Sequence, residues 1–245
     1  MSRNRRMIHR IALSIFFLVF TFQAISLPVP VAAASTPLSR PDIADRLSGI
    51  NTFGMIYPEI RIYEMSAGGV REYMDDWSAK GKENVAKFLK DAFGDRLAER
   101  RKEVLDNAVR DELEEVIALY EVAIASYFQQ AAPINGFPEK RGFSAYELGP
   151  LDNLFASLGV DGLIVVKGVD VISTGGRKTL AVIGAMAGIG LPLGFTGMDI
   201  GFIDRSGGIL WFNSKGSVVG NDFREPEEAA KITGETLSGF PGLKP

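Results

Sequence analysis

Apolar residues recur along the chain with the spacing of amphipathic helices. Steps of three and four residues predict one helix at about residues 74–93, and Gly94 suits the position that follows it. The same spacing predicts a longer helix at about residues 107–131, whose acidic first turns favour the helix dipole. A short helix at 151–158 ends at Gly159, and a last helix begins at Pro226 and runs to about Leu237.

Other stretches carry the pattern of β-strands. We predict strands at 52–57 and 61–65, whereas residues 95–105 fit either a short strand or a helix. Residues 163–166 are apolar at every position, which predicts a central strand covered on both faces. Residues 198–203 alternate, a turn follows at 204–208, and 209–212 return as the second strand of a hairpin.

These elements predict an α/β fold of mixed α+β character. We expect a mixed β-sheet flanked by helices, with a carboxy-terminal β-hairpin and helix. The length suits a single domain at residues 47–245, with the helical segment around 107–131 inside it.

The stretch "STGGRKTL" at residues 173–180 resembles a phosphate-binding loop. A P-loop needs a glycine, four residues, and then Gly-Lys followed by Ser or Thr. Here Arg177 follows Gly176, Lys178 comes one position late, and Val171 stands where the first glycine belongs. We therefore predict a turn that leaves the central strand with its basic pair exposed, and no nucleotide binding.

The segment that follows, residues 180–195, contains no charge and many glycines and alanines. Glycine disfavours helix by about 1 kcal/mol relative to alanine, so we expect two extended pieces around a glycine-rich bend. Three interpretations stay open: a buried segment, a flexible apolar flap, or a loop that inserts into a membrane or a partner. Under the last, the contact residues would be Ile183, Met186, Ile189 and Leu191.

The amino terminus has the layout of a secretory signal peptide. A basic region with Arg3, Arg5, Arg6 and Arg10 precedes an apolar run at 11–22, and three alanines end at Ala34. We predict a signal peptide at 1–34 and a mobile leader at 35–46, with retention of the segment as an anchor as the alternative. This layout predicts an exported bacterial protein.

Composition narrows the chemistry that an exported chain could carry out. The formal net charge is −3, and removal of residues 1–34 leaves 23 basic against 30 acidic residues, which disfavours nucleic-acid binding. The one histidine lies in the signal segment and the chain has no cysteine. Catalysis that needs His or Cys and zinc sites with nitrogen or sulfur ligands are thereby excluded from the mature chain. We predict no catalytic, cofactor-binding or metal-binding residue and no cofactor.

Carboxylates remain as candidate catalytic groups. Asp170, Asp199 and Asp204 lie on or beside predicted strands, and convergence of two of them would suit a glycan hydrolase. Acids in such positions are more often structural, so a glycan hydrolase is the least favoured of the functions that we consider. Trp77 and Trp211 are predicted to lie in the core rather than to form sugar platforms.

Two phrases carry a resemblance to a known group of proteins. They are "FIDRSGGILW" in the hairpin and "LFASLGVDGLIVVKGVDV" across the short helix and central strand. Together they resemble the periplasmic α/β domain shared by the CsgG-like secretion channels, the TolB amino-terminal domain and the LpoB-like activators of peptidoglycan synthases. The resemblance covers about residues 146–216 and implies an envelope interaction or assembly module without catalytic residues. With the export signal, it implies a location in the periplasm, or on the periplasmic face of the outer membrane, of a Gram-negative bacterium.

The leading functional expectation is therefore a non-enzymatic exported accessory protein that binds another envelope protein. The alternative is a membrane-inserting or secretion-channel-like subunit that uses residues 180–195. Membrane contact and self-association into a homo-oligomer are both compatible with the sequence.

Overall fold

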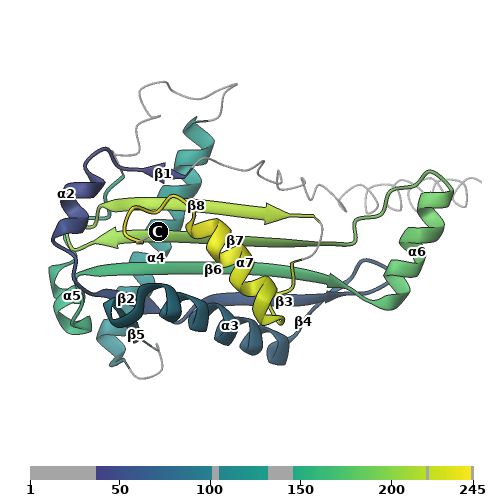
Figure 1. The fold of residues 1–245 in the computed structure, drawn as a ribbon, viewed down its shortest axis with the longest axis horizontal. Coiled ribbons are helices and arrows are strands. Elements are labelled where there is room, and N and C mark those ends of the chain that lie inside the picture. The colour runs from purple at the N-terminus through teal and green to yellow at the C-terminus, as the bar shows by residue number, and fades with distance from the viewer. Residues whose placement is uncertain (1–36, 101–104, 132–145, 219–220, 244–245) are drawn as a thin grey trace, which may run out of the picture. The chain divides into compact units, whose positions relative to one another are not determined.

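The computed structural model describes residues 37–100, 105–131, 146–218 and 221–243, and a mixed eight-stranded sheet organises these parts of the chain (Figure 1). The strand order is β1-β8-β7-β6-β2-β5, with β3 also paired to β6 and β4 paired to β3. The strands are β1 (Leu38–Ser39), β2 (Phe53–Ile56), β3 (Glu59–Met65), β4 (Arg71–Tyr73), β5 (Leu97–Arg100), β6 (Gly162–Ser173), β7 (Gly194–Asp204) and β8 (Ile209–Ser217). The predicted α/β class with a mixed sheet is confirmed.

Strand β6 is the centre of this sheet. It pairs antiparallel with β7 along one side, from Gly162 opposite Asp204 to Ile172 opposite Gly194. On its other side it pairs in parallel first with β2 and then with β3. Its residues 162–166 are all buried, so the prediction of a central strand covered on both faces is confirmed.

Helices α3 (Asp75–Phe93) and α7 (Pro226–Leu237) cover one face of the sheet, as Figure 1 shows. Ile164 and Val166 of β6 belong to the apolar cluster on this face. Helix α3 approaches the sheet closely at Gly81, where an added Cβ would lie 3.1 Å from side-chain atoms of Ile62 and Phe223. The predicted bounds of both helices agree with the structure.

Helices α4 (Asn107–Ala131) and α5 (Asp152–Leu158) cover the opposite face. Leu163 and Val165, the alternate residues of β6, point into this second cluster. Tyr120 of α4 lies directly on Gly201 of β7, where an added Cβ would overlap its hydroxyl. Of the segment 95–105, residues 97–100 form the strand β5, while residues 101–104 lie outside the described residues.

The predicted hairpin is formed by β7 and β8. Trp211 of β8 is fully buried, with its ring edge-on to Phe202 and Phe240 at centroid distances of 5.7 and 5.4 Å. The core position predicted for Trp211 is confirmed. Trp77 is only partly buried, and the Arg224 guanidinium lies 4.0 Å from the centroid of its ring.

The prediction of a mobile leader at 35–46 is wrong for the part that the structure describes. Strand β1 pairs with β8, and helix α2 (Ile43–Ser48) follows it. Arg40 is buried and its Nε donates to Asp42, while Arg46 donates to Asp204 at 2.6 Å. Polar and prolyl composition suggested a linker, but Arg40 also forms an ion pair with Glu147, so this glutamate and Asp204 attach the segment to the rest of the fold. The domain therefore includes residues 37–46, and the predicted signal peptide at 1–34 lies outside the described residues.

Candidate functional site

The connection between β6 and β7 forms a projection that we call the finger, residues 174–193. It consists of helix α6 (Gly175–Met186) and an extended return that leads into β7. In Figure 1 it lies beyond one end of the sheet, away from helices α2, α3, α4, α5 and α7. The finger is the part of the described chain with the most exposed apolar side chains.

Both ends of α6 are capped. At its start the Thr174 hydroxyl accepts a hydrogen bond from the Arg177 amide at 3.3 Å. At its end Gly188 adopts φ 76°, and the amides of Gly188 and Ile189 donate to the carbonyls of Ala185 and Gly184. This pair of bonds is the Schellman arrangement, which satisfies the last carbonyls of a helix.

The prediction of two extended pieces around a bend at 180–195 is therefore wrong. Only Gly184 lies in the interior of α6, where glycine disfavours helix. Gly175 and Gly176 lie in the first turn, and Gly188 terminates the helix in a conformation that glycine favours. The glycines thus mark the ends of this helix rather than prevent it.

One face of α6 packs on the return segment. Arg177 is 8% exposed, and its Nε donates to the Pro192 carbonyl at 3.0 Å. An added Cβ at Gly184 would lie 3.0 Å from the Ile189 carbonyl oxygen. The prediction that both residues of the basic pair are exposed is confirmed for Lys178 and wrong for Arg177, which is buried. The finger is a packed unit, which argues against the interpretation as a flexible flap.

The other face of α6 is apolar and exposed, which contradicts the interpretation of this segment as buried. The four predicted contact residues all lie on the finger with large exposed fractions: Ile183 54%, Met186 79%, Ile189 58% and Leu191 37%. Leu180, Val182 and Leu193, which sequence reasoning did not name, are exposed as well. No charged residue occurs from Thr179 to Met198. An apolar surface of this kind is typical of contact sites.

A second exposed apolar group lies at the base of the finger. The turn between β3 and β4 carries Val70, which is 70% exposed, and Tyr73 in β4 is 42% exposed. Arg177 connects this turn to the finger, because its Nη1 lies 3.5 Å from the Ala67 carbonyl oxygen and donates to it. The sequence marked this turn only by its glycine pair, so its proximity to the finger could not be predicted.

The three candidate carboxylates do not converge. Asp170 faces the α3/α7 side and accepts from the Phe223 amide, whereas Asp199 faces Tyr120 on the α4 side. Asp204 is the last residue of β7 and accepts from the Gly208 amide at 2.9 Å. Burial raises the pKa of Asp199, with opposing effects from Ser214 and Lys167. Across the described ranges, acidic residues form no group of three or more suited to a metal ion.

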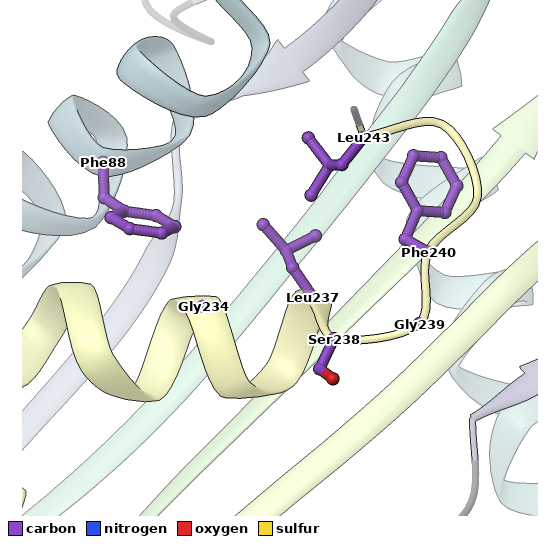
Figure 2. Close-up of a pocket in the computed structure, with 7 residues that line it drawn as sticks. All are labelled: Phe88, Gly234, Leu237, Ser238, Gly239, Phe240 and Leu243. Carbon is purple, nitrogen blue, oxygen red and sulfur yellow. The ribbon is translucent and has the colours of Figure 1, made fainter. Parts of the chain in front are cut away.

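A cavity of about 260 Å³ lies between α3, α7 and the carboxy-terminal turn (Figure 2). Figure 2 shows Phe88 of α3 on one side and Leu237, Phe240 and Leu243 on the other. Gly234, Ser238 and Gly239 complete its lining. Only the Ser238 side chain is polar, so this cavity offers apolar contact and no acid, base or nucleophile pair.

Comparison with known proteins does not assign this chain to a family. The sequence matches no protein-family model, and it matches no curated protein. The resemblance to the periplasmic α/β domain therefore stays a prediction. No helix in the described parts of the chain has the length and apolar character needed to cross a membrane.

Proposed function

We propose that this chain is an exported, non-enzymatic accessory protein of the bacterial cell envelope that binds another envelope protein through the finger. The observation that carries the proposal is the exposed apolar face of a helix capped at both ends. Leu180, Ile183 and Met186 follow one another at three-residue steps, the spacing with which a helix places anchors in an apolar groove. These side chains are 43%, 54% and 79% exposed, so each retains apolar surface whose burial by a partner would favour binding.

Export is supported by the signal-like layout of residues 1–34 alone. Amino-terminal sequencing of the protein from the envelope fraction should give a chain that begins near Ser35. Recovery of an intact Met1 chain from the cytoplasm would contradict export. It would not test binding through the finger, which needs a separate experiment.

The binding surface is tested by site-specific photo-crosslinking in cells. A photoreactive residue at Ile183 should crosslink to a partner, whereas one at Val122, on α4, should not. Val122 and Val182 provide a matched pair, since both lie on helices and are 67% and 62% exposed. Val182→Asp should abolish the crosslink from position 183, and Val122→Asp should preserve it. Equal crosslinking from both variants would contradict the proposal, and a crosslink between two copies would identify the partner as a second copy.

The uncharged sequence from Thr179 to Met198 favours a second candidate function, insertion of the finger into a membrane. Lys178 at the base would then lie at the lipid headgroups. Flotation with vesicles of phosphatidylethanolamine and phosphatidylglycerol separates the two candidates. An inserting finger carries the protein to the vesicle fraction, and Val182→Asp abolishes this, whereas a protein-binding finger leaves the purified protein unfloated.

A further inference from the structure

Asp170 is a buried acid that the proposed function does not use. It lies on β6 between Ile62 of β3 and Thr196 of β7, and it is 1% exposed. The nearby cation Arg224 forms its ion pair with Asp222 at 2.6 Å instead. Burial of an ionised carboxylate without an ion pair of its own is strongly unfavourable, so the protonation state of Asp170 needs an explanation.

The hydrogen bonds around Thr196 decide that state. Its hydroxyl oxygen lies 2.8 Å from Asp170 Oδ1 and 2.7 Å from the Asn221 carbonyl oxygen. A threonine hydroxyl has one hydrogen to donate, and a carbonyl oxygen can only accept. When Thr196 donates to Asn221, the short contact with Asp170 is a hydrogen bond only if Asp170 supplies the second hydrogen.

We infer that Asp170 binds a proton and donates it to Thr196, which in turn donates to Asn221, so that this proton holds the segment 221–225 against the sheet. This segment connects the end of β8 to α7. The Phe223 amide donates to the other carboxyl oxygen, Oδ2, at 3.4 Å, which adds a second attachment. Loss of the proton turns the Thr196 hydrogen toward Asp170, and the carbonyl of Asn221 then loses this donor.

The charged groups near Asp170 come mainly from the connector itself. The pKa of Asp170 is raised to about 6. Burial is the main cause and Asp222 adds to the rise, while Thr196, Phe223 and Arg224 oppose it. Lys80 of α3 acts on Asp222, and Glu225 at the start of α7 acts on Arg224. From β3 the sheet contributes only the apolar Ile62 opposite Asp170.

The sign of the pH dependence follows from the raised pKa. An unfolded aspartate titrates near 3.9, so the native state holds one proton more than the unfolded state between about pH 4 and pH 6. The stabilisation is complete below about pH 4 and is lost as the pH rises through about 6. From this group alone, the unfolding equilibrium constant should rise by roughly a hundredfold between pH 4 and pH 8.

The test begins with the wild-type protein, so it does not depend on a variant that folds. The ¹³C resonance of the Asp170 carboxyl, followed by NMR from pH 3 to pH 8, should show the protonated form at pH 5 and titrate above it. The ¹³C resonance of the Asn221 carbonyl should shift over the same pH range, because this oxygen loses the Thr196 hydrogen when Asp170 ionises. An Asp170 carboxyl that titrates at or below its ordinary value near 3.9 overturns the inference.

Two variants isolate the proton relay. Asp170→Asn keeps a donor toward Thr196 and an acceptor for Phe223 but cannot ionise, so its Asn221 carbonyl resonance should not change between pH 5 and pH 8. Thr196→Val removes the relay, so the Asn221 carbonyl resonance should no longer depend on pH between pH 5 and pH 8. Asp91→Asn, an exposed change on α3, should behave as wild type. A pH dependence in Asp170→Asn equal to that of wild type would also overturn the inference.

Discussion

Two uncharged stretches of this chain have opposite environments. Residues 163–166 in β6 are buried on both faces, whereas residues 179–193 of the finger are mostly exposed. Both are rich in aliphatic side chains, so composition does not separate them. Their positions in the topology do, because β6 has strands on both sides and helices on both faces, while α6 lies beyond the end of the sheet. An apolar sequence alone therefore does not predict burial. Its position in the topology determines whether other parts of the same chain cover it.

The largest expected effect lies at the centre of the core. Trp211→Ala removes a fully buried ring that contacts Phe202 and Phe240, and it should reduce the free energy of unfolding by about 3–5 kcal/mol. Urea denaturation followed by circular dichroism measures this loss. Trp77→Ala, which removes a partly buried ring, is the control and should have a clearly smaller effect. Equal losses would mean that burial does not distinguish the two rings.

The direct comparison of the two stretches uses one substitution at two positions. Leu163→Ala, at a fully buried position in β6, should destabilise by about 2–5 kcal/mol. Leu180→Ala, at a position 43% exposed on α6, should change stability by less than about 1 kcal/mol. The same denaturation experiment measures both variants. A large loss at Leu180 would show that the finger is buried in solution.

Two glycines allow a similar comparison of packing. Gly201→Ala introduces a methyl group against the Tyr120 hydroxyl and should cost about 1–3 kcal/mol. Gly190→Ala, in the return of the finger, meets no atom within 4 Å and should change stability by about 0.5 kcal/mol or less. Tyr120→Phe in the Gly201→Ala background should recover part of the loss, and its failure to do so would locate the strain elsewhere.

The smallest expected effect on stability is at the proposed binding surface. Val182→Asp places a charge on an exposed position and should shift the free energy of unfolding by about 0.5 kcal/mol or less. The same change should abolish the crosslink from position 183. If Val182→Asp unfolds the protein, loss of crosslinking carries no information, and Met186→Ser, at a position 79% exposed, replaces it.

Much of the fold was predictable because its elements carry local signals. The last helix has Pro226 at its first position, and the alternation of residues 198–203 identifies the hairpin. The finger was predicted wrongly because the large number of glycines was taken to exclude a helix. The effect of a glycine depends on its position, and only Gly184 lies in the interior of α6. The role of residues 37–46 was missed because Arg40 and Arg46 bind acids distant in sequence, Glu147 and Asp204.

The candidate site was predictable only in part. The absence of charge marked Ile183, Met186, Ile189 and Leu191 as contact residues, and their exposure is compatible with that role. Arg177 helps to orient α6, because its guanidinium donates to the carbonyl oxygens of Pro192 and Ala67. No spacing in the sequence records that contact. The proton relay of Asp170 likewise depends on residues from three separate segments.

The topology also makes the finger dispensable for the sheet. Strands β6 and β7 are antiparallel neighbours, paired up to Ile172 opposite Gly194, so a turn of two residues would suffice to join them. An added Cβ at Gly194 would overlap the Val171 carbonyl oxygen, so the return into β7 is accommodated by the absence of a side chain. The finger is thus an insertion at a hairpin tip, and a shortened chain that keeps the sheet would test whether the proposed partner binding depends on the finger alone.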